Sequence, residues 1–181
     1  MSSDKLIVLF PGVNYSVEMP LFYYAQFTYE MRGYKVLHIS YKTNISADFT
    51  YEEYLATIKQ MVYKQLLNQN LDNYKEIIFI SKSIGTVLAG WIASERNLEV
   101  KHIFLTPIYD TLQYIGGQNI VAVIAGREDN KLDKEILMEH CRKENIYLHQ
   151  FDHVGHRLES KVNMELNLNI LRNVIEIYNL V

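Results

Sequence analysis

Short apolar runs alternate with longer amphipathic runs along the whole chain. Six runs contain few polar residues, as strands buried on both faces do: 6–10, 34–39, 76–80, 102–105, 120–124 and 146–149. Five others repeat apolar residues at helical spacing: 21–31, 51–69, 84–94, 131–143 and 160–180. The alternation predicts a doubly wound α/β fold, in which a mainly parallel six-stranded sheet carries helices on both faces.

The length of the chain indicates how many domains it forms, and its charge indicates which partners to exclude. A chain of 181 residues predicts a single domain over residues 1–181. The net charge is −3, and lysine and arginine are scattered rather than clustered. We therefore expect neither a nucleic-acid partner nor binding to an anionic membrane surface. The sequence leaves the oligomeric state open.

The beginning of the chain and its cysteine content indicate a compartment. The first residues run directly into an apolar strand without a signal-peptide core, and no apolar stretch approaches membrane-spanning length. A cytoplasmic protein is the expectation. The single cysteine, Cys141, excludes an internal disulfide framework and a cysteine metal site, and we expect it to be half-buried on a helix.

A short serine-containing turn, Ser81-Lys82-Ser83-Ile84-Gly85, joins the third expected strand to the helix after it. A strand that enters a helix through small-x-Ser-x-Gly is typical of a nucleophile elbow. The turn is so tight that the serine takes unusual backbone angles and the residues two before and two after it must be small. The alternative is that Ser83 simply caps the helix. Lys82 is expected to play no part in the chemistry, with contact to an anionic substrate as the alternative.

A serine hydroxyl needs a histidine to take its proton and a carboxylate to orient that histidine. Right-handed crossovers bring every strand-to-helix loop to one edge of the sheet. Asp129 follows the fifth strand and is the candidate acid, with Glu128 and Asp110 as alternatives. His156 follows the sixth strand and is the candidate base, with His153 as the alternative. The other histidines look structural: His38, His102, His140 and His149.

An oxyanion formed at the serine needs N–H donors in fixed positions. The backbone of Ile84 follows the candidate nucleophile at a helix N-terminus, where the helix dipole favours negative charge. The backbone of Val13 lies in the loop after the first strand, and the preceding Gly12 permits a bend. Both are candidate oxyanion donors, although the second segment also fits a plain Pro-Gly turn.

Residues 11–13, 81–85, 126–129 and 155–159 together resemble a small, lidless serine hydrolase of the α/β-hydrolase family. The resemblance spans almost the whole chain and implies a Ser83–Asp129–His156 triad, an acyl-enzyme route and no cofactor or metal. Ser81 stands where the family commonly has glycine, and Pro11 where histidine is frequent. The two strands that often precede the first family strand are missing.

The segments around the expected site bear on its access. Residues 106–119, where the family often carries a lid, leave room for one short helix only, which predicts an open site. Tyr15, Tyr109 and Tyr114 are candidates for its mouth, although a chain with 14 tyrosines places some near any loop. Residues 41–50 read as a surface loop.

Two functions from different classes follow. The first is a cofactor-independent serine hydrolase that cleaves a small acyl ester or thioester. The second is a non-catalytic binding or interaction protein that retains the same scaffold. A nucleotide-binding protein is disfavoured, because no G-x-G-x-x-G follows the first strand and no G-x-x-x-x-G-K-[ST] occurs.

Overall fold

A computed structural model describes residues 4–41 and 49–181, so most of the expected surface loop at 41–50 lies outside the described residues. Six strands in these ranges form one sheet with the order β2-β1-β3-β4-β5-β6. They are β1 (Lys5–Phe10), β2 (Lys35–His38), β3 (Glu76–Lys82), β4 (Lys101–Leu105), β5 (Ile120–Gly126) and β6 (Leu148–Phe151). Every neighbouring pair is parallel. The predicted parallel sheet is confirmed.

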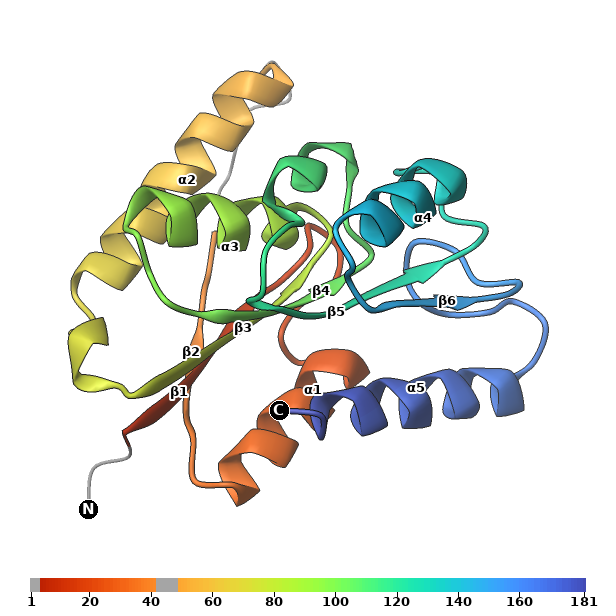
Figure 1. The fold of residues 1–181 in the computed structure, drawn as a ribbon, viewed down its shortest axis with the longest axis horizontal. Helices are drawn as coiled ribbons and strands as arrows, with labels where there is room; N and C mark the ends of the chain where they lie inside the picture. The colour runs from red at the N-terminus through yellow and green to blue at the C-terminus, as the bar shows by residue number, and fades with distance from the viewer. Residues whose placement is uncertain (1–3, 42–48) are drawn as a thin grey trace.

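Helices cover the sheet on both sides (Figure 1). The α-helices are α1 (Pro20–Met31), α2 (Tyr51–Leu67), α3 (Ile84–Glu95), α4 (Lys134–Lys143) and α5 (Met164–Tyr178). Short 3-10 helices are η1 (Leu71–Asn73) and η2 (Tyr109–Tyr114). Helices α1 and α5 pack on one face of the sheet, whereas α2, α3 and α4 pack on the other, each layer with its own apolar core.

Two helices begin later than the apolar spacing predicts, because a polar side chain caps each of them. Asp133 accepts hydrogen bonds from the backbone N–H groups of Glu135 and Ile136, so α4 begins at Lys134 rather than at 131. Asn163 accepts from the N–H of Leu166, so α5 begins at Met164 rather than at 160.

The sixth strand is displaced by two residues from its expected position at 146–149. Asn145 has a φ of 55° and reverses the chain after α4. The N–H of Ile146 then donates to the carbonyl of Cys141 at 2.8 Å, which assigns Ile146 to the helix end rather than to the strand. Cys141 itself is 1% exposed, not half-buried, because it faces the core under α4.

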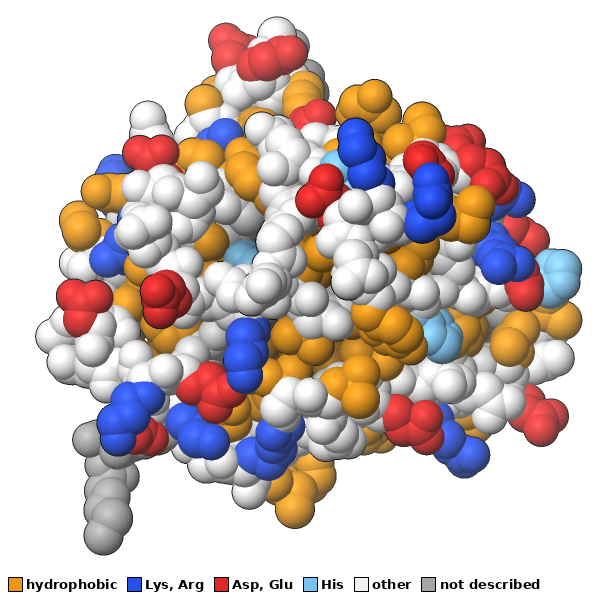
Figure 2. Space-filling model, viewed as in Figure 1, with side chains coloured by type: hydrophobic (Ala, Val, Ile, Leu, Met, Phe, Trp, Pro, Cys, Tyr) orange, Lys and Arg blue, Asp and Glu red, His pale blue; other side chains and the backbone are white. Residues whose placement is uncertain are grey.

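The surface carries charges of both signs. Acidic and basic side chains mix over the face seen in Figure 1, and hydrophobic side chains gather between the two helix layers (Figure 2). Among the helices that the structure describes, none has the length and apolarity needed to cross a bilayer. The segment between β4 and β5 holds η2 as its only helix, as expected, and no lid domain stands there.

Candidate active site

The turn between β3 and α3 forces Ser83 into a strained backbone conformation. Ser83 has φ 54° and ψ −125°, a region that residues with a side chain rarely adopt. The turn passes directly under β1: a Cβ on Gly85 would lie 2.3 Å from the carbonyl oxygen of Phe10. Glycine is therefore required at position 85, and the hydroxyl of Ser83 is presented at the carboxyl edge of the sheet.

Ser83, His156 and Asp129 form a continuous chain of hydrogen bonds. His156 Nε2 lies 2.8 Å from Ser83 Oγ, and His156 Nδ1 lies 2.7 Å from Asp129 Oδ2. The Asp129 side chain is 4% exposed and that of His156 is 23% exposed. The carboxylate is thus shielded from water, while the imidazole and the hydroxyl keep access to the cavity described below. The three residues expected from the sequence are brought together.

The loops after β5 and β6 are bonded to each other, which fixes the distance between the acid and the histidine. The N–H of Glu128 donates to the carbonyl of Val154 at 2.9 Å. The second carboxylate oxygen of Asp129 accepts from the backbone N–H of Lys131 at 2.9 Å. Both oxygens of this carboxylate are therefore engaged, so the side chain has one orientation.

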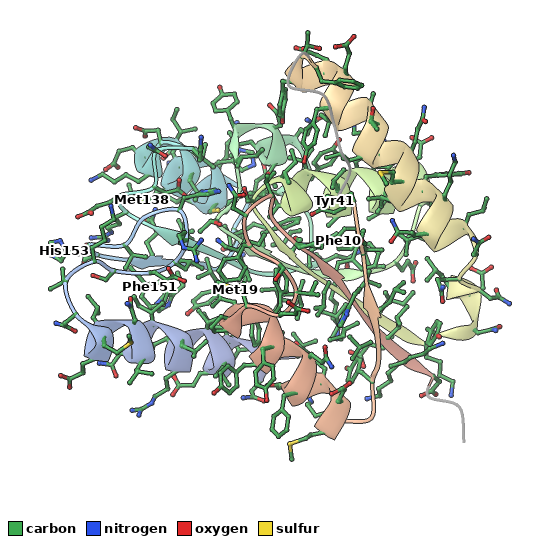
Figure 3. The ribbon with its side chains drawn as sticks, turned by 180° about the vertical axis from the view of Figure 1, so that it is seen from behind. Phe10, Met19, Tyr41, Met138, Phe151 and His153 are labelled. Atoms are coloured by element: carbon green, nitrogen blue, oxygen red, sulfur yellow. The ribbon has the colours of Figure 1, made fainter. Side chains whose placement is uncertain are left out.

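The alternative acids and the alternative base lie elsewhere. His153 Nδ1 and Glu128 Oε1 are 3.3 Å apart, with side chains 72% and 62% exposed. Figure 3 places His153 at the periphery of the molecule, whereas Phe10 lies inside it. Asp110 accepts a hydrogen bond from the hydroxyl of Tyr51 at 2.6 Å. None of the three is bonded to Ser83 or His156 among the hydrogen bonds of the described residues.

Two backbone segments border Ser83 where an oxyanion would form. A tight turn bonds the N–H of Gly12 to the carbonyl of Tyr15 at 3.1 Å, and a Cβ on Gly12 would lie 3.3 Å from that of Ser83. Val13 in this turn and Ile84 in the first turn of α3 both line the cavity beside the serine. The segments named from the sequence therefore flank the hydroxyl.

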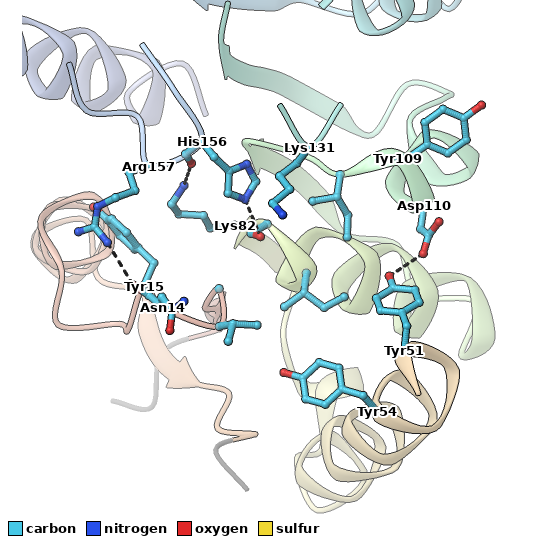
Figure 4. A pocket seen from close by; sticks show the side chains of 15 residues that line it. Asn14, Tyr15, Tyr51, Tyr54, Lys82, Tyr109, Asp110, Lys131, His156 and Arg157 are labelled. Carbon is cyan, nitrogen blue, oxygen red and sulfur yellow. Dashed lines mark hydrogen bonds between the residues drawn. The ribbon is translucent and has the colours of Figure 1, made fainter. Parts of the chain in front are cut away.

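A cavity of about 650 Å³ opens beside the serine (Figure 4). Its walls come from the loops after β1, β3, β4, β5 and β6 and from the first turn of α2: Gly12, Val13, Asn14, Tyr15, Tyr51, Tyr54, Lys82, Ser83, Ile84, Ile108, Tyr109, Asp110, Lys131, His156 and Arg157. Val13 and Tyr109 are 61% and 62% exposed, so the rim is open to solvent. Most of the wall is apolar or aromatic.

The three tyrosines expected at the mouth have different positions. Tyr109 lies at the rim. Tyr15 lines the cavity but is 4% exposed, and its hydroxyl accepts from the N–H of Leu21 at 3.2 Å; burial raises its pKa to about 12. Tyr114 does not line the cavity and packs over α3 instead, where a Cβ on Gly90 would lie 2.4 Å from that of Tyr114.

Sequence reasoning missed the tyrosines of α2. Tyr51 and Tyr54 line one side of the cavity (Figure 4). On that side the Tyr51 hydroxyl donates to the neighbouring Asp110. The sequence does indicate that the first turn of α2 lies near the site, because a helix that follows β2 begins at the carboxyl edge of the sheet. The capping box of Thr50 and Glu53 marks that beginning.

Lys82 was expected to play no part in the chemistry, and its burial was not predicted. Its side chain is 1% exposed, because β3 is covered on both faces. The ammonium donates to Thr106 Oγ1 and to the backbone carbonyl of His156, both at 2.7 Å. Burial lowers the pKa of Lys82 to about 7, and the nearby Asp129 carboxylate opposes this shift.

Residues 4–41 and 49–181 contain no group of three or more His, Cys, Asp or Glu side chains arranged to hold a metal ion. The chemistry that these ranges offer is that of the hydroxyl, the imidazole, the carboxylate and the backbone N–H groups around them. In this arrangement an imidazole is able to take the proton of the hydroxyl and so activate it as a nucleophile.

Neither a protein-family model nor a curated protein sequence matches the chain, but solved structures do. An alpha-beta serine hydrolase homologue from Coxiella burnetii is 9% identical with a TM-score of 0.67, over 100% of this chain and 87% of the other. The Pyrococcus furiosus esterase Pf2001 is 18% identical with a TM-score of 0.66, over 98% and 83%. Mouse alpha/beta hydrolase domain-containing protein 10 is 13% identical with a TM-score of 0.67, over 100% and 92%. These likenesses show that the chain has the α/β-hydrolase fold.

Proposed function

We propose that the protein is a cofactor-independent serine hydrolase that cleaves a small acyl ester or thioester. The observation that carries the proposal is the hydrogen-bonded chain from Ser83 through His156 to Asp129, with Ser83 on a strained turn. A fold alone does not define an activity, so the argument rests on these three side chains and on the cavity beside them.

The first half of the reaction acylates Ser83. Its hydroxyl oxygen attacks the substrate carbonyl, and His156 Nε2 takes the hydroxyl proton. Asp129 accepts the Nδ1–H of His156 and stabilises the imidazolium. The N–H groups of Val13 and Ile84 hold the oxyanion of the tetrahedral intermediate. The intermediate then collapses: the bond to the alcohol or thiol breaks, and His156 gives its proton to the leaving group.

The second half releases the acid. A water molecule enters from the open rim of the cavity, and His156 removes a proton from it as it attacks the acyl carbonyl. The second tetrahedral intermediate collapses, the acyl–oxygen bond to Ser83 breaks, and His156 returns the proton to the serine oxygen. The free enzyme is regenerated without any oxidant, reductant or metal.

The cavity favours a small and partly apolar acyl group. Its volume of about 650 Å³ is typical of small-molecule sites. Val13, Ile84 and Ile108 supply aliphatic walls, and Tyr109 stands at the exposed rim. An open rim admits an accessible ester more readily than a long lipid chain that must be withdrawn from a bilayer.

We also propose that the protein acts in the cytoplasm.

The non-catalytic alternative makes a different prediction about geometry. A scaffold that had lost catalysis has no need to keep the histidine within bonding distance of the serine. His156 Nε2 and Ser83 Oγ are 2.8 Å apart, which supports the hydrolase rather than the binding protein.

The experiment that tests the proposal is labelling with a fluorophosphonate probe, which reacts only with an activated serine. We expect the intact protein to be labelled and Ser83→Ala to be unlabelled. His156→Ala and Asp129→Asn should label at least about 1000-fold more slowly, the order of loss seen when such a triad is broken. A labelled protein then justifies a screen of short acyl esters and thioesters.

Matched variants make the test specific. His153→Ala and Glu128→Gln change the neighbours of the base and the acid, but both side chains are exposed and bond to each other. Both variants should label at the rate of the intact protein. Absence of labelling in a folded intact protein would reject the hydrolase and favour the binding protein.

A further inference from the structure

The residue before Ser83 in the strained turn is a lysine with almost no contact with solvent. Lys82 ends β3, which lies in the middle of the sheet between β1 and β4. Its side chain is 1% exposed, and a buried ammonium without partners is strongly unfavourable. The position therefore requires specific acceptors, and the structure supplies them from three separate loops.

The three partners of the ammonium surround it. Lys82 Nζ donates to Thr106 Oγ1 after β4 at 2.7 Å. It also donates to the carbonyl of His156 after β6, at 2.7 Å (Figure 4). It also lies 4.9 Å from the centre of the Tyr15 ring after β1. The ammonium is thus surrounded by a hydroxyl, a carbonyl and an aromatic face. One of these is the backbone of the proposed base.

The support beneath the lysine is rigid. Thr106 has φ 43° and its N–H donates to the carbonyl of Ile124 at 2.7 Å, so the acceptor for Lys82 is fixed between two strands. The His156 loop is bonded to the loop after β5 at Val154, whose carbonyl accepts the N–H of Glu128 at 2.9 Å. Within the loop, the N–H of Leu158 donates to the carbonyl of Gly155 at 3.0 Å, whereas the bond from Lys82 ties His156 itself to the sheet.

Charged groups from several loops face this ammonium. Asp129 and Glu159 favour its charged form, whereas Arg157 and burial disfavour it. Arg157 is paired with Glu159 at 2.8 Å and stacks on the other contact of the lysine, the Tyr15 ring, at 5.7 Å. A charged donor makes roughly twice as strong a hydrogen bond as a neutral one. The hydrogen bond from Lys82 to the His156 carbonyl is therefore strongest when Lys82 is protonated.

We propose that Lys82 is a positioning residue that ties the His156 loop to the sheet and so holds the imidazole between Ser83 and Asp129. An effect of Lys82 on the reaction rate rests on the proposed function. Its effect on the position of the His156 imidazole does not. Without the ammonium, the carbonyl of His156 and the hydroxyl of Thr106 lose a shared donor, and the loop loses its bond to the sheet at the backbone of His156 itself. A displacement of about 1 Å at a reacting group is enough to cost roughly 100-fold in rate.

The first measurement is the proton spectrum of the His156 imidazole, which reports its position whether or not the protein is an enzyme. An Nδ1–H bonded to a buried carboxylate gives a far-downfield signal that is sharp only when the ring is held in place. His156→Ala identifies the signal. We expect it to broaden or vanish in Lys82→Met, which keeps the length of the side chain but removes its donors, and to persist in Lys143→Met.

Lys143→Met is the matched control for this signal, because Lys143 is an exposed lysine at the end of α4 that does not line the cavity. Circular dichroism establishes that each variant is folded. If Lys82→Met does not fold, Thr106→Val replaces it, since that variant keeps the lysine but removes one acceptor; the signal should broaden there too.

The second measurement is the fluorophosphonate labelling rate, which should fall roughly 10- to 100-fold in Lys82→Met. An unchanged signal and an unchanged rate in folded Lys82→Met would overturn the positioning role and leave the hydrolase intact. A signal that is lost in Lys82→Met, in a protein that is never labelled, would reject the hydrolase and support the positioning role.

Discussion

Gly126, the last residue of β5, passes so close to Val154 that a Cβ on Gly126 would lie 2.0 Å from the Val154 carbonyl oxygen. This carbonyl also accepts the N–H of Glu128 at 2.9 Å. The contact joins the loop of Asp129 to the loop of His156 by backbone alone. The separation of the acid and the base therefore depends on the absence of a side chain at position 126.

Gly126→Ala is predicted to push these two loops apart. The methyl group would overlap backbone rather than a flexible side chain, and such overpacking costs about 1–3 kcal/mol of unfolding free energy. The labelling rate of Ser83 should fall roughly 10- to 100-fold, because the imidazole loses its alignment. Gly155→Ala is the control, since its Cβ would meet only the Glu128 carbonyl oxygen at 3.9 Å. Equal labelling of both variants would contradict the prediction.

Ser81→Ala is predicted to stabilise the protein without loss of labelling. Ser81 is fully buried, and its hydroxyl has no hydrogen-bond partner in the described structure. Alanine removes an unsatisfied polar group and keeps the small size that the turn demands, which should add about 1 kcal/mol to the unfolding free energy. Urea unfolding measures this gain. A loss of stability would show that the hydroxyl has a partner.

The fold and the Ser83–His156–Asp129 arrangement could be predicted from sequence because both depend on local patterns. Apolar runs buried on both faces define a parallel sheet, and such a sheet places every strand-to-helix loop at one edge. Position relative to strand ends made Asp129 and His156 candidates, with Glu128, Asp110 and His153 as alternatives, and the family resemblance implied the choice that the hydrogen bonds show. The pattern at residues 81–85 itself marked the turn at Gly85, where close packing on Phe10 excludes a side chain.

Other features depend on contacts between distant residues and escaped prediction. Lys82 was expected to play no part in the chemistry, and its burial against Thr106 and His156 could not be predicted from the local sequence. Tyr114 belongs to the segment after β4 that was expected to border the cavity. It packs instead against Gly90 of α3, where there is no side chain, and so lies outside the cavity. The first residues of β6 were misplaced because the positive φ of Asn145 cannot be read from an apolar run.

Tyr51→Phe is predicted to change substrate binding more than chemistry. The Tyr51 hydroxyl donates to Asp110 at 2.6 Å and so closes one wall of the cavity, while neither residue is bonded to Ser83 or His156. Burial and the Asp110 carboxylate raise the pKa of Tyr51 well above its usual value, so the hydroxyl stays protonated and donates at all working pH values.

Loss of this bond should raise KM for a short p-nitrophenyl ester by no more than about tenfold, the range of one hydrogen bond to a charged group, and leave kcat within about twofold. Steady-state kinetics measures both. A large fall in kcat with unchanged KM would mean that the Tyr51–Asp110 pair acts on the reacting atoms.

His102 is buried near the start of β4, whereas the loop that lines the cavity follows the other end of this strand. Its ring stacks on Phe104 at 5.0 Å and meets Phe79 edge-on at 5.6 Å, and its Nδ1 has no hydrogen-bond partner in the described structure. Burial lowers the pKa of His102 to about 4. The folded protein therefore keeps this ring neutral at a pH where the unfolded chain, with a pKa of 6.5, is already protonated.

Stability should consequently fall as pH drops from 6.5 to 4, because the unfolded state binds the proton more readily than the folded state. The loss from this ring alone is about 2 kcal/mol at pH 5. His102→Phe keeps an aromatic ring beside Phe79 and Phe104 but cannot take up a proton. Urea unfolding at pH 7 and pH 5 should show a smaller loss for this variant by about that amount. The same loss in both proteins would mean that His102 is protonated within the fold, and its unpartnered nitrogen would then need a carboxylate or water that reaches the ring.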